Sequence, residues 1–176
     1  MKQLICGILI LLSVPGCETY GVYYDKPVMN IPYGMRQPNW GRYGSCVHAS
    51  LIMLLRWQNQ NELANAWPYS EGEYYKRFCN RLDQAGIKYA STFEKKDVSF
   101  LEWAVRTRRG CMVDCQNGRH MIILVDLDRT HATLLDNNNV KKFKKVPRDK
   151  FLKEWFNAQS WALTVVYAPP PPPIKR

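Results

Sequence analysis

The sequence predicts an α+β domain in which helices come first and an antiparallel sheet follows. Before about residue 110, apolar residues recur mainly at helical spacing, and from Cys111 onward short apolar runs alternate with turn residues. Helices and strands that are segregated along the chain are typical of the α+β class. An apolar content of 46% and the length of residues 37–168 are sufficient for one domain with its own core.

Five helices are expected, of which four precede the strands and one interrupts them. The predicted ranges are 46–57, 62–67, 71–84, 97–105 and 148–157, of which 62–67 is either a separate short helix or an extension of the first. Asp97 or Ser99 is suited to cap the start of the fourth helix, and Gly86 is placed to stop the third.

Strands are predicted at 111–115, 120–127, 131–136, 140–143 and 161–167, with a short strand-like step at 87–90. The lysines between 141 and 145 alternate with apolar Val140, Phe143 and Val146, which is typical of a solvated edge strand. The closing strand 161–167 follows the last helix.

The N-terminus has the pattern of an export signal over residues 1–16, with a basic Lys2 before a short apolar run. That run is too short to span a membrane stably. Gly16 directly before Cys17 resembles the lipobox of bacterial lipoproteins, which implies acylation of Cys17 and a membrane-anchored protein. Ordinary secretion with cleavage nearby is the alternative, because Pro15 departs from the usual pattern.

The segments that flank the domain lack a regular apolar period. Residues 17–36 contain scattered Tyr, Gly and Pro and are predicted to form a tether. At the other end, five consecutive prolines in residues 169–176 impose a stiff polyproline II tail. The predicted domain therefore occupies residues 37–168.

The chain carries 25 basic and 15 acidic residues, and removal of the signal takes away only Lys2. This excess favours anionic surfaces of the cell envelope as partners, such as phospholipid headgroups or wall polymers. An exported protein does not meet nucleic acid in its compartment, so nucleic acid is not expected as a partner.

Cys46 is the strongest candidate for a chemical role. It follows the turn-like run 41–45 and opens the helix predicted over 46–57. The first N–H groups of a helix lack intrahelical partners and carry the positive end of the helix dipole, so they favour a thiolate there. A thiol in this place is suited to nucleophilic attack near neutral pH.

His120 and Asp136 supply the groups that such a thiol requires. His120 enters the apolar strand 120–127, and Asp136 ends the next strand, with Asn137 beside it as a substitute. A nucleophile needs a base, and the base needs an orienting acceptor at its second ring nitrogen. His48 and His131 are poorer base candidates, because His48 points to another helix face and His131 lies in the return strand.

Three further cysteines remain once Cys46 and Cys17 are set aside. If Cys46 is free, one disulfide can form, and Cys79 is a more plausible partner for Cys111 or Cys115 than these two are for each other. Four residues of strand span about 13 Å, beyond the reach of a disulfide. A metal site of Cys111, Cys115 and His120 lacks a fourth ligand, so neither a metal nor a cofactor is predicted.

This succession resembles the papain-like cysteine peptidase superfamily, in particular its compact bacterial branch related to the peptidase domains that trim double-glycine leader peptides. The chain order of cysteine, histidine and then carboxylate or amide is the same. The resemblance covers residues 37–167, and its best-matched segments are 44–46, 85–87, 118–120, 134–136 and 146–151. It implies a papain-like fold, with the Cys46 helix packed on the C-terminal antiparallel sheet.

The resemblance also implies roles for these residues. Cys46 corresponds to the nucleophile, His120 to the general base and acid, and Asp136 to the orienting group. The family usually has a glutamine six residues before the cysteine, whose amide stabilises the oxyanion, but this chain has Trp40 there. Gln37 or Asn39 is then expected to supply the amide N–H.

The sequence therefore predicts an exported, membrane-tethered cysteine hydrolase that cleaves peptide or isopeptide bonds of a peptide or protein substrate. Transfer of the acyl group to an amine uses the same residues. The alternative is an inactive papain-like domain that binds an envelope or protein partner through aromatic and basic residues.

Overall fold

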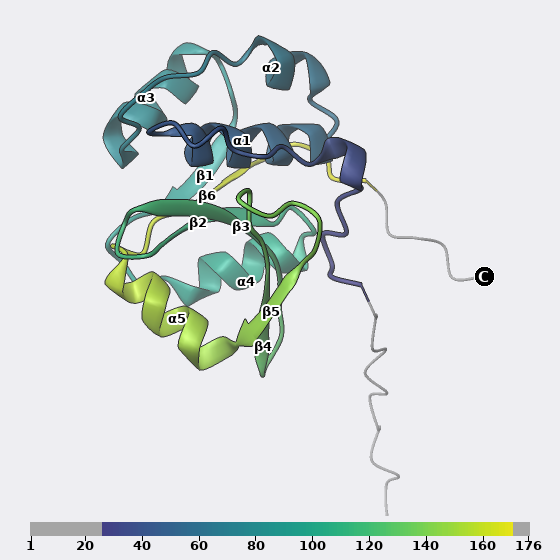
Figure 1. Cartoon of the computed structure of the whole chain (residues 1–176), viewed down its shortest axis with the longest axis vertical. Coiled ribbons are helices and arrows are strands. Elements are labelled where there is room, and N and C mark those ends of the chain that lie inside the picture. Colours follow the sequence, from purple (N-terminus) through teal and green to yellow (C-terminus); the bar gives the residue numbers. More distant parts are fainter. Residues whose placement is uncertain (1–25, 171–176) are drawn as a thin grey trace, which may run out of the picture.

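The computed structural model describes residues 26–170, and the predicted signal, Cys17 and most of the proline-rich tail lie outside this range. A sheet forms the middle layer, with helices on both faces (Figure 1). The helices are η1 (Tyr33–Met35), α1 (Ser45–Trp57), α2 (Asn61–Ala66), α3 (Tyr75–Gln84), α4 (Val98–Arg106) and α5 (Arg148–Asn157). In the part of the chain that is described, none of these helices has the length and apolarity needed to cross a membrane.

The sheet contains six strands in the order β1-β6-β2-β3-β4-β5, and every neighbouring pair is antiparallel. The strands are β1 (Tyr89–Thr92), β2 (Cys111–Cys115), β3 (His120–Leu127), β4 (His131–Leu135), β5 (Lys144–Pro147) and β6 (Ala162–Val165). Helices thus precede most of the sheet in the chain, and the predicted α+β class is confirmed.

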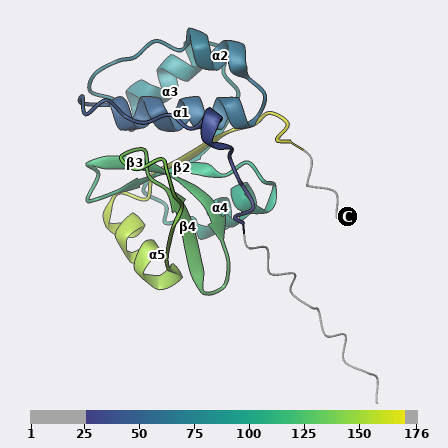
Figure 2. The ribbon, with the colours of Figure 1, turned by 45° about the vertical axis from the view of Figure 1, so that its right-hand side comes forward.

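Each face of the sheet packs against its own set of helices. Along β3, Ile123 and Val125 belong to the core beneath α1 and α3, whereas Ile122 and Leu124 belong to the core beneath α4 and α5. This is the two-residue alternation of a strand. Figure 2, turned from the first view, also shows α1–α3 on one side of the sheet and α4 and α5 on the other. The parity of a residue in β3 or β4 therefore decides which helical layer its side chain meets.

The predicted tether, residues 17–36, extends too far into the domain. Met29 and Ile31 are fully buried in the core beneath α1, and the Met29 backbone N–H bonds to the Val125 carbonyl at 3.0 Å. These two apolar side chains make the segment part of the domain, which begins before residue 37.

The strand predicted at 140–143 is also misplaced, because β5 pairs with β4 only over Lys144–Pro147. Arg36 holds the preceding loop. Its guanidinium donates to the Val140 carbonyl at 2.7 Å and lies 4.4 Å from the centroid of the Phe143 ring. Residues 140–143 thus contact Arg36 and do not pair with β4.

The predicted disulfide does not form in the described residues, where Cys46, Cys79, Cys111 and Cys115 are all free thiols. Cys79 lies in α3 and packs in the core on one face of the sheet, whereas Cys111 and Cys115 lie in β2 and face the other core. The sheet thus separates Cys79 from both of its expected partners.

Candidate active site

Cys46 lies in the first turn of α1, as its sequence context predicts. The helix begins at Ser45, whose hydroxyl donates to the Arg42 carbonyl at 2.6 Å, and no side chain caps the helix start. Within residues 26–170, the backbone N–H of Cys46 has no hydrogen-bond acceptor. A free N–H and the positive end of the helix dipole thus meet at the thiol.

Gly44 fixes the entry of the chain into α1. Its φ is +82°, in the left-handed region, and a Cβ built there would lie 2.9 Å from the Ser70 carbonyl oxygen. A larger residue would be strained by its backbone and would also push the 70–72 loop away. The glycine therefore allows the turn that places Cys46 at the helix start.

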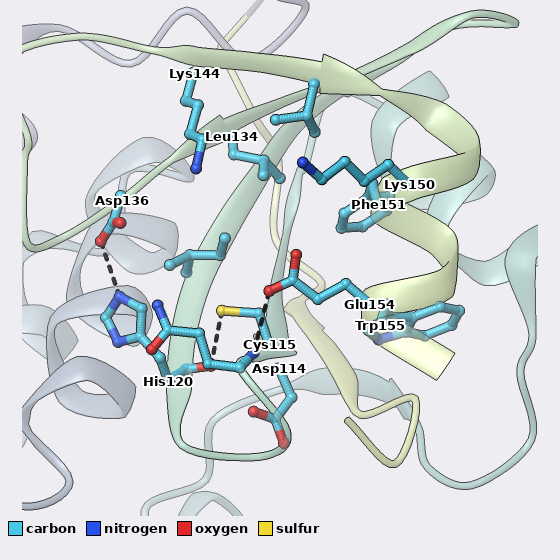
Figure 3. A pocket seen from close by; sticks show the side chains of 13 residues that line it. Asp114, Cys115, His120, Leu134, Asp136, Lys144, Lys150, Phe151, Glu154 and Trp155 are labelled. Atoms are coloured by element: carbon cyan, nitrogen blue, oxygen red, sulfur yellow. Dashed lines mark hydrogen bonds and ion pairs between the residues drawn. The ribbon is translucent and has the colours of Figure 1, made fainter. Parts of the chain in front are cut away.

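His120 begins β3 and joins Cys46 to Asp136. Its Nε2 lies 2.8 Å from a carboxylate oxygen of Asp136, as Figure 3 shows, and the imidazole lies close enough to the Cys46 thiol to lower the pKa of that thiol. The His120 side chain is 7% exposed, and the Asp136 side chain is 32% exposed. The structure thus brings Cys46, His120 and Asp136 together at one site.

The ionisation of these groups is coupled. Burial raises the pKa of the Cys46 thiol, but hydrogen bonds with His120 and with the backbone of Met121 and Val47 outweigh it, so that pKa lies below its ordinary value. Burial disfavours protonated His120, but hydrogen bonds with Asp136 and Cys46 raise its pKa to about 9. The hydrogen bond with His120 in turn lowers the pKa of Asp136. This pattern favours a thiolate beside an imidazolium.

Asn137, the predicted substitute for Asp136, faces the other side of the sheet. It is 1% exposed, and its amide N–H groups lie within hydrogen-bond distance of the Cys46 carbonyl, the Ser50 hydroxyl and the Met121 carbonyl, at 3.1, 3.1 and 2.8 Å. Asn137 therefore ties α1 to the sheet and does not contact the imidazole. The expectation that it substitutes for Asp136 is wrong.

Asn138 does contact the imidazole, and the sequence reasoning missed it. Its amide nitrogen lies 3.1 Å from His120 Nε2, and its amide oxygen accepts from the Asn39 side chain. Asn138 lies in the turn after β4, where strand alternation does not apply, and its backbone N–H donates to the Asp136 carboxylate at 2.8 Å.

The two amides predicted to stabilise an oxyanion are occupied elsewhere. Asn39 donates to Asn137 at 2.8 Å and to Asn138, and the Gln37 amide donates to the Pro38 carbonyl at 3.4 Å and accepts from Arg56 at 3.2 Å. The structure thus engages both amides in other contacts, and the expected oxyanion role of Gln37 or Asn39 stays a prediction.

Trp40 occupies the position at which the family has its glutamine. The indole is half exposed and packs 5.1 Å from the His48 ring and 5.5 Å from the Tyr69 ring, measured between centroids. His48 is buried, and burial lowers its pKa. This aromatic cluster lies beside the first turns of α1, and His48 serves there as a packing residue.

Comparison with known proteins gives similarity in structure only. No protein-family model matches the sequence, and no curated protein matches it. A C39-like peptidase from Bacillus anthracis superposes with a TM-score of 0.58 at 18% identity, covering 82% of this chain and 98% of the other. A double-glycine motif protease from an AMS/PCAT transporter, solved with its leader peptide, gives 0.44 at 16% identity, over 68% and 82% of the two chains.

The first of these similarities spans nearly the whole of the Bacillus protein, so it compares complete domains. In this chain Cys46 lies at the start of α1, which packs on an antiparallel sheet, as the resemblance in sequence implies. The chain therefore has the papain-like fold of the C39-type peptidases.

Proposed function

We propose that this protein is an exported cysteine peptidase that cleaves peptide or isopeptide bonds through an acyl-enzyme. The observation that carries the proposal is the position of His120, which lies beside the Cys46 thiol and 2.8 Å from Asp136. A nucleophile, a base and an orienting carboxylate in this order form a complete set for covalent acyl transfer.

In the first step, the Cys46 thiolate attacks the carbonyl carbon of the scissile bond, and a negative charge develops on the carbonyl oxygen. The free backbone N–H of Cys46 stabilises this oxyanion. His120 then gives its proton to the leaving amine as the C–N bond breaks, which produces a thioester on Cys46.

In the second step, neutral His120 takes a proton from water, and the resulting hydroxide attacks the thioester. The C–S bond then breaks and the acid product leaves, which restores the thiolate beside the imidazolium that took the proton from water. Asp136 holds the imidazole in the tautomer that presents its other nitrogen to the thiol. An amine in place of water gives acyl transfer with the same residues.

The same geometry also fits a binding domain that has lost its activity, and one observation favours that alternative. Trp40 stands where the family has its oxyanion amide, and the amides of Gln37 and Asn39 are engaged elsewhere. Loss of one oxyanion donor reduces turnover by roughly 10² to 10³. A measurement of activity must therefore detect slow hydrolysis.

Site-resolved labelling with iodoacetamide, followed by mass spectrometry across pH, tests the nucleophile. Cys46 should react well below the pH at which ordinary thiols react, whereas burial raises the pKa of Cys79, Cys111 and Cys115, which serve as internal controls. His120→Ala should return the labelling of Cys46 to the ordinary pH range. Equal labelling of Cys46 in both proteins at pH 6 contradicts a catalytic pair.

Hydrolysis is tested with a mixture of peptides digested over days, with Cys46→Ser as the control. Products that appear with the parent protein and are absent with Cys46→Ser support a peptidase. A reactive Cys46 without any product supports the binding domain.

We also propose export and acylation of Cys17, which rest on the sequence of residues 1–17 alone. The protein should then fractionate with membranes, and in a Gram-negative host with the outer membrane, because Glu18 is not the aspartate that retains lipoproteins at the inner membrane. Cys17→Ala should release it. Recovery of that variant in the same membrane fraction contradicts the lipid anchor.

A further inference from the structure

A cavity opens on the α5 face of the sheet, next to the imidazole. It encloses about 110 Å³, and His120 and Asp136 form one wall while α5 and β5 form the other (Figure 3). Cys46 is not among its lining residues. The cavity is therefore separate from the space beside the thiol, although the two share the imidazole.

The floor of the cavity is apolar and its rim is charged. Ile122, Leu134 and Phe151 supply the floor. Lys144 of β5 and Lys150 of α5 supply two ammonium groups, which Figure 3 shows turned toward the space between them. Within residues 26–170, neither ammonium group has an ion-pair or hydrogen-bond partner.

Three carboxyl groups also line the cavity, but only one of them offers a free negative charge to balance the lysines. Asp136 is paired with His120. Burial raises the pKa of Asp114 to about 7, so this group is largely protonated in weakly acidic solution. Glu154 accepts from the Gln116 backbone N–H at 3.3 Å and has no ion-pair partner within residues 26–170. Two lysines therefore face one free carboxylate, and the cavity has an excess of positive charge.

The chemistry of the proposed reaction decides which part of a substrate reaches this cavity. His120 must protonate the leaving amine, so the residue that carries this amine passes directly beside the imidazole. The acyl part stays bonded to Cys46, on the α1 side. The side chains that follow the scissile bond are thus the ones that come within reach of the cavity beyond His120.

Resting on the proposed function, we propose that this cavity is a specificity site for the leaving segment of the substrate and that it selects an acidic group there. An Asp or Glu side chain, or the terminal carboxylate of a short leaving segment, fits between Lys144 and Lys150. Its methylene groups contact the apolar floor and its carboxylate pairs with the two ammonium groups. The substrate class is then a peptide with an acidic residue just after the cleaved bond.

The test uses the full-length protein and a diverse peptide mixture, in which mass spectrometry identifies each cleaved bond. With the parent protein, Asp and Glu should be enriched about fivefold over Lys and Arg at the first two positions after the bond, which is the size expected for partly exposed charge pairs. The double variant Lys144→Gln/Lys150→Gln should lose this enrichment.

The chain offers a matched control for the removal of charge. Lys145 and Lys153 lie on the same two elements but do not line the cavity. Lys145→Gln/Lys153→Gln should keep the acidic preference of the parent.

The outcomes separate the two proposals. Cleavage that depends on Cys46 but has no acidic preference, or an equal loss of preference in both double variants, overturns the specificity site and leaves the peptidase standing. If the parent cleaves no more peptide than Cys46→Ser, the peptidase itself fails, and the specificity site fails with it.

Discussion

The two faces of the sheet differ in what they contribute to the site. On the α1 face, Asn137 is buried and hydrogen-bonded to Cys46, Ser50 and Met121, and it holds the nucleophile helix in place. On the α5 face, Asp136 meets His120, and a charged cavity lies behind them. Two consecutive residues thus serve opposite layers, because strand parity sends their side chains to opposite faces.

Neighbouring positions therefore have different roles, because Asn137 contributes to stability and Asp136 to the chemistry of the site. The amide of Asn137 is inaccessible, and its loss would leave buried polar groups without partners. The carboxylate of Asp136 is partly exposed, and its loss would remove the contact with the imidazole and a hydrogen bond from the Asn138 backbone N–H. Substitutions at the two positions should therefore give opposite results in assays of activity and of stability.

The largest effect on activity within this comparison is expected for Asp136→Ala. Without the carboxylate, the imidazole loses its preferred tautomer and the raised pKa, and the rate of hydrolysis should fall roughly 10²- to 10⁴-fold. Above about pH 9, where the stabilisation from the raised His120 pKa is already lost, the melting temperature should change little. Rates of peptide hydrolysis and of iodoacetamide labelling, measured with thermal unfolding on the same preparation, check both parts. An unaltered rate would remove Asp136 from the mechanism.

Asn137→Ala should show the reverse pattern. The substitution leaves the Met121 and Cys46 carbonyls and the Ser50 hydroxyl without this donor, so the free energy of unfolding should fall by about 2 kcal/mol. That corresponds to a fall of several degrees in the melting temperature. Labelling of Cys46 below the denaturation range should remain within a few-fold of the parent. A selective loss of reactivity in a stable protein would instead give the amide the orienting role.

The rate of hydrolysis should rise and then fall with pH, with an acid limb set by Cys46 and an alkaline limb set by His120. The acid limb should lie below the ordinary range of a thiol, because the pKa of Cys46 is lowered, and the rate should fall again above about pH 9 as His120 loses the proton required by the leaving amine. Asp136→Ala should move the alkaline limb to lower pH. An alkaline limb that does not move in this variant would contradict the link between Asp136 and His120.

The same raised pKa makes a prediction for stability. His120 titrates near its ordinary value of 6.5 in the unfolded chain and near 9 in the folded one. Its contribution is therefore complete below about pH 6.5 and is lost as the pH rises through 9. Thermal unfolding of the parent and of His120→Ala between pH 6 and 10 should converge at the alkaline end. A difference that stays constant across this range would contradict the raised pKa.

Periodicity was sufficient to predict the fold class, the helices α1 and α5 and the strands β2 and β3. The position of Cys46 at a helix start, of His120 at the start of a strand and of Asp136 just after a strand made them candidates, and the structure brings them together. The position of β5 and the burial of Met29 depend on contacts with distant residues, Arg36 with Phe143 and Met29 with Val125, which no local pattern reveals. The disulfide prediction failed because the sheet separates the cysteines.

The smallest expected effect concerns the link between Asn39 and Asn138, which joins the segment before Cys46 to the loop after Asp136. Asn138→Ala removes a neighbour of the imidazole, and Asn39→Ala releases Asn138. Each should slow the labelling of Cys46 by about 3- to 10-fold, the equivalent of one hydrogen bond of about 1 kcal/mol.

Because the two side chains act as one unit, the double variant Asn39→Ala/Asn138→Ala should be little slower than either single variant, and a double-mutant cycle measures this coupling. The same cycle distinguishes the link from the oxyanion role first expected for Asn39. An oxyanion donor acts only when a carbonyl is attacked, so its loss would reduce hydrolysis by roughly 10² to 10³ while leaving alkylation of the thiol unchanged. Equal, small losses in both reactions support the link, and a large loss confined to hydrolysis would return Asn39 to the oxyanion site.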